Sequence, residues 1–369
     1  MPDTPSPISR LLHHRARALT KGAPVALPIV ASSTFHLPGD PDGSHFYGRN
    51  GNPTVEQVEA EIGILEGGEA ILFPSGMAAI ASVFYAHLRP GDTVLVHSDG
   101  YYNVRALLEA QFVPMGVKVK TCPTTEFVSA DMTGCKMVMI ETPSNPGLAV
   151  CDIAAVAARA KAAGALLVAD NTTATAICQQ PLDLGADIVV MSDTKAMAGH
   201  SDVLAGHVAT RHSALMDPIR TWRRLAGAIV SPFDAYLLHR GIATLELRLS
   251  RANDNAMTAA EALRTHPAVR AVNYPGLTND PSHETAKRQM RGFGPVVSFT
   301  LESREKAEKF IENSELIVSA TSFGGVHASA ECRIRWGDAV PEGFVRLACG
   351  IEPVSDFVTS LTRALDSVG

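Results

Sequence analysis

Residues 165–195, ALLVADNTTATAICQQPLDLGADIVVMSDTK, contain two short apolar runs, and each run ends in polar residues. Their length and their Val, Ile and Leu content predict two buried strands of a parallel sheet, Ala165–Asp170 and Asp187–Ser192. The carboxyl ends of parallel strands meet at one edge of a sheet, where α/β proteins bind ligands. We therefore expect Asp170 and Lys195 at the same edge, although each taken alone would also fit a surface ion pair.

The alternation of apolar runs with helical patterns extends outward from this stretch, from Val55 to Thr210. It predicts one large α/β domain with a mostly parallel sheet and crossover helices. The further strands are expected at Ala70–Phe73, Thr93–His97, Lys136–Ile140 and Leu204–Thr210, and the helices at Val55–Leu65, Gly76–Leu88, Tyr102–Gln111 and Ile153–Gly164.

The pattern changes after Ser231-Pro232 to a long helical stretch, Phe233–Arg264, in which Gly241 predicts a bend. A smaller α+β domain follows, with strands expected at Val269–Val272, Val296–Leu301 and Gly343–Leu347 and helices at Arg304–Asn313 and Pro353–Asp366. We therefore divide the chain into an N-terminal arm (1–45), an α/β domain (46–231) and a C-terminal α+β domain (232–369).

The composition indicates an ordinary soluble globular protein of 369 residues, with 46% hydrophobic and 19% charged residues. The 32 Lys+Arg against 38 Asp+Glu give a formal net charge of −6, and no basic run is longer than Arg223-Arg224, so nucleic-acid binding is not expected. No apolar run approaches the roughly 20 residues of a membrane helix. The N-terminus lacks the apolar core of a secretory signal, and we expect a cytoplasmic protein.

The metal-ligating residue types are scattered along the chain. Six cysteines occur without any CxxC pair, which favours free thiols over disulfides or a zinc site. His200 and His207 have no third ligand at a recognisable spacing. We expect no metal site.

The segment Pro74–Ala79, PSGMAA, follows the first predicted strand and opens a helix. Free N–H groups and the helix dipole make such a turn suitable for a phosphate, although Ser75 would equally serve as a simple helix cap. A phosphate-binding turn together with Asp170 and Lys195 indicates a pyridoxal phosphate site. There the amine would carry the cofactor as a Schiff base and the carboxylate would keep the ring nitrogen protonated.

Seven ordered motifs carry a family resemblance that covers nearly the whole chain. They are YGRNGNPT at 47–54, LEGG at 65–68, SGM at 75–77, ETPSNP at 141–146, DNT at 170–172, SDTK at 192–195 and GHSD at 199–202. Together they resemble the Cys/Met-metabolism family of pyridoxal phosphate enzymes, the group of cystathionine γ-lyase, γ-synthase and β-lyase and of methionine γ-lyase. Within it, the chain looks most similar to bacterial cystathionine γ-lyase-like proteins.

The resemblance implies a fold-type I pyridoxal phosphate transferase-like architecture and assigns the cofactor contacts residue by residue. Catalysis would depend on Lys195, which holds the cofactor and carries protons, on Asp170 at the ring nitrogen, and on Tyr101, which stacks on the ring. The residues after Tyr101 are Tyr102-Asn103-Val104, where the family usually has Gly-Gly-Thr. The remaining cofactor contacts would come from Ser75, Gly76, Met77, Asn145, Thr172, Ser192 and Thr194, and from Tyr47 and Arg49 of a neighbouring subunit.

The resemblance also implies a substrate and an assembly. Arg346 would hold the substrate α-carboxylate, because a planar bidentate donor suits that group, with Asn145 and Ser322 completing the pocket. Thr321 stands where γ-lyases and γ-synthases commonly have glutamate. A subunit that lends Tyr47 and Arg49 to its neighbour must be at least a dimer, and family members are usually tetramers.

The activity expected is α,γ-elimination on a sulfur amino acid, which gives cysteine or a thiol, 2-oxobutanoate and ammonia. Three alternatives remain at this point. They are a methionine γ-lyase, γ-replacement on an O-acylhomoserine, and a catalytically idle oligomeric paralogue.

Overall fold

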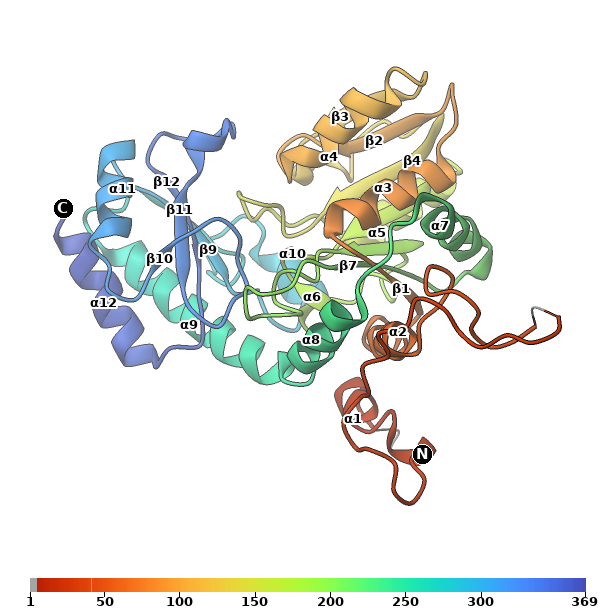
Figure 1. Cartoon of the computed structure of the whole chain (residues 1–369). Helices are drawn as coiled ribbons and strands as arrows, with labels where there is room; N and C mark the ends of the chain where they lie inside the picture. The colour runs from red at the N-terminus through yellow and green to blue at the C-terminus, as the bar shows by residue number, and fades with distance from the viewer. Residues whose placement is uncertain (1–4, 41) are drawn as a thin grey trace.

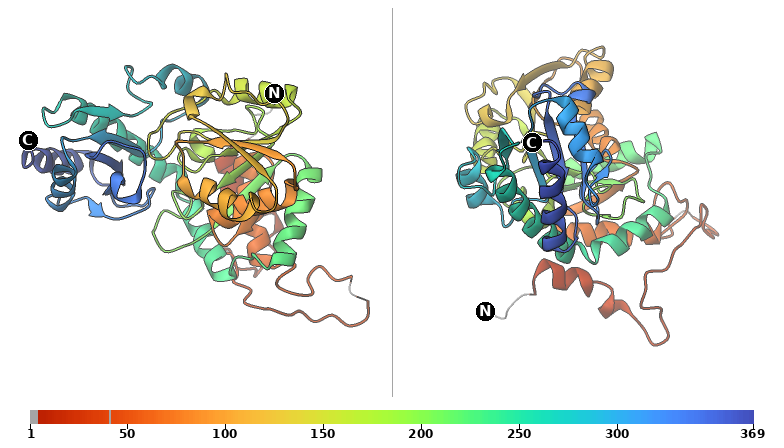
Figure 2. Two further views of the ribbon diagram at one scale, coloured as in Figure 1. Left: turned by 90° about the horizontal axis from the view of Figure 1, so that it is seen from above. Right: turned by 90° about the vertical axis from the view of Figure 1, so that its left-hand side faces the viewer.

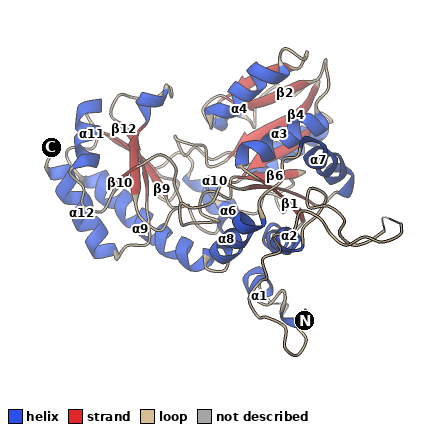
Figure 3. Ribbon diagram, in the orientation of Figure 1, coloured by secondary structure: helices blue, strands red, loops and turns tan. Residues whose placement is uncertain are grey.

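A computed structural model describes residues 5–40 and 42–369 and contains two β-sheets, each covered by helices. The larger sheet and its helices form one half of the body and the smaller sheet the other half (Figures 1 and 3). Before the first long helix lies an N-terminal arm, part of which extends away from the body (Figure 2), while Leu11 packs into the core beside residues 55–65. The arm includes the short helix α1 (Pro7–Leu12) and a 3-10 turn at Ala16–Ala18.

The larger sheet has seven strands in the order β1-β7-β6-β5-β4-β2-β3. Only β7 runs antiparallel to its neighbours, so the remaining strands present their carboxyl ends at one edge. The bounds are Glu69–Phe73 for β1, Thr93–His97 for β2, Lys118–Cys122 for β3, Cys135–Glu141 for β4, Leu166–Asp170 for β5, Ile188–Met191 for β6 and Gly206–Thr210 for β7.

Alternate residues of these strands pack into different cores. Val168, Ile188 and Val190 pack with α3 (Gly76–His87), α4 (Tyr102–Leu107) and α7 (Ser213–Ala226) on one face. Leu167 and Ala169 face the opposite side, where α5 (Ile153–Ala162) lies beside the region covered by α2 (Pro53–Glu66). Burial on both faces is the reason why these strands are continuous apolar runs.

The mostly parallel α/β class is confirmed, and all six strands expected in this sheet are present within two residues of the predicted bounds. Sequence analysis did not predict β3, α7 or the short α6 (Thr175–Cys178). The helix expected at Tyr102–Gln111 is shorter than predicted, because α4 ends at Leu107 and a π-helical turn, Leu108–Phe112, follows it.

The smaller sheet has five strands in the order β10-β11-β12-β9-β8. Its core contains Phe299, Phe310 and Phe357, which belong to the sheet and to the helices packed against it. The bounds are Ala271–Asn273 for β8, Val296–Thr300 for β9, Val318–Ser319 for β10, Ser329–Cys332 for β11, Phe344–Ala348 for β12, His283–Gln289 for α10, Arg304–Glu312 for α11 and Val354–Asp366 for α12.

The helical stretch predicted at Phe233–Arg264 is confirmed, but it is divided into two helices instead of being bent at Gly241. Two helices occupy this stretch, α8 (Pro232–Ile242) and α9 (Leu245–Thr265). Gly241 lies in the last turn of α8, where an added Cβ would lie 2.4 Å from the carbonyl oxygen of Ala198. The glycine is therefore required for close packing on the loop after Lys195. The break between α8 and α9 begins two residues further along the chain.

Helix α9 joins the two halves of the body, because Leu245 and Leu249 belong to the core of the first sheet and Ala256 and Leu263 to that of the second. The three-part division of the chain at residues 45 and 231 stays a prediction.

All six cysteines are free thiols in the described structure. Among the described residues no group of His, Cys, Asp and Glu is arranged to hold a metal ion. No helix in residues 5–40 and 42–369 has the length and apolar character needed to cross a bilayer.

Candidate active site

A cavity of about 390 Å³ opens at the carboxyl edge of the larger sheet, where the second half of the chain faces it. Loops after β1, β2, β4, β5 and β6 line one side, and residues of the smaller sheet line the other. The structure brings thirteen of the predicted site residues to this cavity: Ser75, Gly76, Met77, Tyr101, Asn145, Asp170, Thr172, Ser192, Thr194, Lys195, Thr321, Ser322 and Arg346.

Tyr47 and Arg49 do not line this cavity. Arg49 donates to the backbone carbonyl of Arg224, 2.9 Å away, and lies over the ring of Tyr47. The side chain of Tyr47 is exposed. Their predicted role in the site of a neighbouring subunit stays a prediction.

Lys195 projects into the cavity, and its Nζ donates to Ser322 Oγ at 2.8 Å. Burial, followed by the charge of Arg346, lowers the pKa of the amine to about 8. Ser322 has a φ of +86°, and the next turn places Gly324 against Ala196 so closely that a Cβ would lie 2.5 Å from its nitrogen. The second half of the chain is thus packed tightly against the lysine loop. An amine with this pKa can accept a proton near neutral pH.

Asp170 ends β5 beneath the same cavity. Its Oδ1 accepts from the backbone N–H and the hydroxyl of Thr172, at 2.9 and 2.6 Å. The hydroxyl oxygen of Thr172 in turn accepts from the Ser192 N–H at 2.9 Å. Burial raises the pKa of Asp170, which the bonds from Thr172 and the charge of His207 oppose. Because both bonds go to Oδ1, Oδ2 remains available to a cationic ring nitrogen.

The first turn of α3 forms a cradle beside the lysine. Ser75 caps the helix by accepting from the Ala78 N–H at 3.1 Å. The N–H groups of Gly76 and Met77, at the start of the helix, have no carbonyl partner within it. A Cβ on Gly76 would lie 2.7 Å from the Ser192 Cβ, so only glycine allows the helix end to approach the strand β6 loop this closely. Unpaired N–H groups and the helix dipole at this point suit a phosphate.

Arg346 lies on β12, nearly fully buried, on the opposite wall. It donates to Asn145 Oδ1 at 2.6 Å and to the Ser322 carbonyl at 3.0 Å, and forms an ion pair with Glu331. Its Nε is buried without a partner among the described residues. Burial lowers the pKa of the guanidinium to about 10, which leaves it charged at neutral pH. The guanidinium is thus held in a fixed orientation at the cavity wall, where it can pair with a carboxylate ligand.

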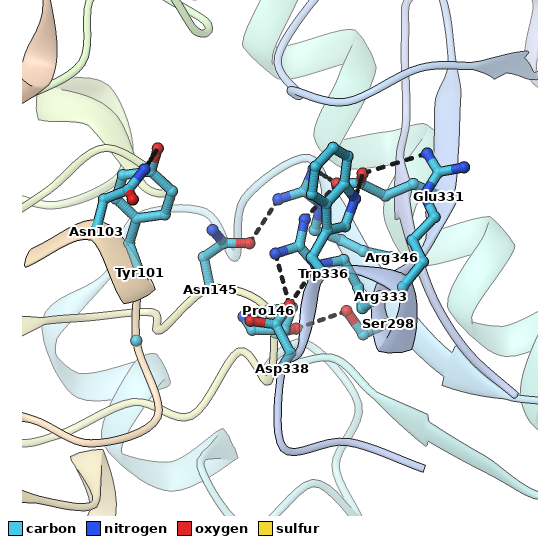
Figure 4. Close-up of polar contacts among 12 residues, drawn as sticks. Tyr101, Asn103, Asn145, Pro146, Ser298, Glu331, Arg333, Trp336, Asp338 and Arg346 are labelled. Carbon is cyan, nitrogen blue, oxygen red and sulfur yellow. Dashed lines mark hydrogen bonds and ion pairs between the residues drawn. The ribbon is translucent and has the colours of Figure 1, made fainter. Parts of the chain in front are cut away.

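Glu141, which sequence analysis did not assign to the site, ties two of its loops together. Its carboxylate accepts from the backbone N–H groups of Tyr101 at 2.6 Å and Asn145 at 2.8 Å. Burial and the charge of Asp170 raise its pKa well above the ordinary value. The Tyr101 hydroxyl accepts from Asn103 Nδ2 at 2.7 Å, as Figure 4 shows, and burial raises its pKa.

A second group that sequence analysis missed surrounds Arg346. Glu331, Arg333 and Trp336 line the cavity, and Glu331 faces Arg346 across the β11–β12 ladder (Figure 4). The sequence signal for these residues was the charged and aromatic motif CRIRW, residues 332–336. The pairing of Glu331 with Arg346 depends on a strand register, which the local sequence pattern does not encode.

Comparison with known proteins agrees with this geometry. The family model described as "Cys/Met metabolism PLP-dependent enzyme" matches residues 9–366. A Streptomyces coelicolor protein named "Putative cystathionine gamma-lyase" is 50% identical over 92% of this chain and 88% of its own. An L-methionine gamma-lyase of Pseudomonas deceptionensis is 38% identical over 98% and 97%. The crystal structure of cystathionine gamma synthase from Xanthomonas oryzae in complex with cystathionine superimposes with a TM-score of 0.95, at 35% identity over 99% of both chains.

The chain therefore belongs to the Cys/Met-metabolism family of pyridoxal phosphate-dependent enzymes, as the motifs predict. It is an enzyme of sulfur amino-acid chemistry whose cofactor is pyridoxal phosphate. The cavity fits this cofactor, because Gly76 opens a cradle for the phosphate, Asp170 offers Oδ2 and Lys195 a buried amine.

Proposed function

We propose that the protein catalyses α,γ-elimination on a sulfur amino acid, of the cystathionine γ-lyase type, releasing a thiol such as cysteine, 2-oxobutanoate and ammonia. The observation that carries the proposal is the buried Lys195 amine, with a pKa lowered to about 8, in one cavity with the buried Arg346 guanidinium. The similarity to the Streptomyces coelicolor relative supports the γ-lyase reaction in particular.

Different residues of this chain have separate roles in the proposed reaction. Arg346 and Asn145 bind the substrate carboxylate and so orient Cα, and Ser322 accepts a hydrogen bond from the Lys195 amine when that amine is free. When bound, pyridoxal phosphate supplies an electron sink for the charge that develops at Cα. Lys195 removes the Cα proton and then a Cβ proton, whose electron pair allows the bond from Cγ to sulfur to break, and Lys195 or Tyr101 donates a proton to the departing thiol.

The cofactor contacts are assigned on the same basis. Asp170 pairs with the ring nitrogen, oriented by Thr172. The phosphate is held by Ser75, Gly76, Met77, Ser192 and Thr194, which meet at the first turn of α3.

We also propose that the enzyme is a cytoplasmic homotetramer in which each site is completed by Tyr47 and Arg49 of a neighbouring subunit. These two side chains lie outside the cavity of their own chain. The assembly can be tested by light scattering and by mixing Arg49→Ala with Lys195→Ala subunits, which should restore activity in sites that receive both wild-type residues.

The reaction is tested by measuring oxoacids from cystathionine, methionine, cysteine and O-acylhomoserine side by side. We expect 2-oxobutanoate from cystathionine in the wild type and none from Lys195→Ala. Pyruvate from cystathionine would indicate β-elimination instead. Faster cystathionine formation from O-acylhomoserine and cysteine than cystathionine breakdown would indicate γ-replacement.

A further inference from the structure

The 3-10 turn Arg333–Trp336 is fixed to the cavity by two carboxylates. Asp338 Oδ2 accepts from Arg333 at 2.7 Å from Nε and 2.6 Å from Nη2, and Glu331 Oε1 accepts from its Nη1 at 2.5 Å. The Arg333 and Glu331 side chains are both buried. Arg333 is thus engaged at both ends of its guanidinium and holds the turn in place.

Trp336, the last residue of this turn, is held by its single polar atom. Its Nε1 donates to Glu331 Oε2 at 2.8 Å, and the guanidinium of Arg335 lies 5.6 Å from the ring centre. The residue is 46% exposed and lines the cavity. Because indole has no other hydrogen-bonding group, the surface that it offers to the cavity is apolar.

The orientation of Trp336 is linked to that of the carboxylate-binding arginine. One carboxylate, Glu331, accepts from Trp336 through Oε2 and pairs with Arg346 through Oε1. Figure 4 shows Trp336 and Tyr101 on opposite sides, with Asn145 between them. Arg346 contacts that same Asn145. A substrate held at Arg346 therefore shares the cavity with the rings of Tyr101 and Trp336.

The acidic groups of the cavity are already committed to protein donors. Glu141, Asp170 and Glu331 each accept at least two hydrogen bonds within the described residues. The large apolar side chains among the described lining residues include Tyr101, Tyr102, Leu204, Phe323 and Trp336, and of these Leu204 and Trp336 are the most exposed. Contact with the substrate side chain is therefore apolar rather than ionic.

We propose that Trp336 is a specificity-determining residue, on whose indole the carbon–sulfur chain of the substrate's leaving group packs. The inference rests on the proposed function, because it requires a thiol leaving group on a substrate held at Arg346. Each methylene group buried against the ring is expected to raise kcat/KM about fourfold, and this gain should be lost when the indole ring is removed.

The first test compares substrates that differ only in the length of the S-alkyl group, namely methionine, ethionine and S-propyl homocysteine. We expect the wild-type kcat/KM to rise along this series, Trp336→Phe to keep most of the rise and Trp336→Ala to abolish it. A loss in Trp336→Ala that is equal for all three substrates would overturn the inference while leaving the elimination activity intact. No oxoacid from any substrate would overturn the proposed function instead.

The second test measures binding without turnover. The chain has two tryptophans, and Trp222 stacks on Tyr85 with ring centres 5.6 Å apart, outside the cavity. Trp222→Phe therefore leaves Trp336 as the sole tryptophan and serves as the matched control for activity.

Norleucine has the chain length of methionine but no leaving group. In the Trp222→Phe holoenzyme it should shift the fluorescence emission of Trp336 to shorter wavelength, whereas alanine should not. Binding of norleucine, detected by cofactor absorbance, with unchanged emission would show that the indole is not in contact with the ligand.

Discussion

The stability of the enzyme should fall as the pH rises into the alkaline range, because the histidine His207 is buried between two carboxylates. Its ring lies between Asp193, 2.7 Å from Nδ1, and Glu66, 3.3 Å from Nε2, and none of the three side chains is exposed. Burial lowers the pKa of His207, but the two carboxylates outweigh it and raise the pKa to about 10. Asp193 stands between Ser192 and Thr194, so this charged group supports the loop that carries Lys195.

The sign follows from proton uptake. Between the unfolded pKa of about 6.5 and the folded pKa of about 10, the native protein keeps a proton that the unfolded chain has lost. The free energy of unfolding therefore falls by up to about 1.4 kcal/mol per pH unit in this window, and by about 5 kcal/mol across it. The contribution is complete below pH 6.5 and is lost above pH 10.

Urea unfolding of the holoenzyme from pH 7 to pH 10 measures this slope. The comparison is His207→Gln combined with Asp193→Asn and Glu66→Gln, which replaces all three buried titrating groups by neutral ones and leaves no unpaired buried carboxylate. We expect the triple variant to lack the decline with pH. Other titrating groups, such as Lys195, are common to both proteins and cancel in the difference. Parallel pH profiles for the wild type and the triple variant would refute a charged His207.

The strands of the larger sheet were predictable because they are buried on both faces and so appear as apolar runs in the sequence. The missed strand β3, Lys118–Cys122, lies at the sheet edge and has lysine at two of its five positions. Its apolar content is too low for the pattern that revealed the others. The antiparallel direction of β7 was also not predictable, since an apolar run carries no information about direction.

The site residues that were predicted directly follow strands or belong to motifs. Those that were missed depend at least in part on contacts between segments distant in sequence. Glu331 reaches Arg346 only because β11 and β12 pair in one particular register. Glu141 ends β4, and its role depends on the return of the Tyr101 and Asn145 backbones to its carboxylate. Chemistry at the strand ends is thus local in sequence, whereas the support of that chemistry is not.

Two further predictions concern the two ends of the cavity. Lysine in Arg346→Lys cannot reproduce the planar fork of the guanidinium, and loss of a charge-assisted hydrogen bond should raise the KM for the amino acid about 10- to 150-fold. The control is Arg270→Lys, at an exposed ion pair. An unchanged KM in Arg346→Lys would exclude Arg346 as the carboxylate ligand. Gly76→Ala would place a Cβ 2.7 Å from the Ser192 Cβ and displace the first turn of α3, an overpacking effect of about 1–3 kcal/mol. Because that turn is proposed to bind the phosphate, the cofactor's dissociation constant, measured by titrating the apoenzyme and following absorbance, should rise about 5- to 150-fold. An unchanged constant with normal folding would place the phosphate elsewhere, because an anion held by those N–H groups must respond when they move.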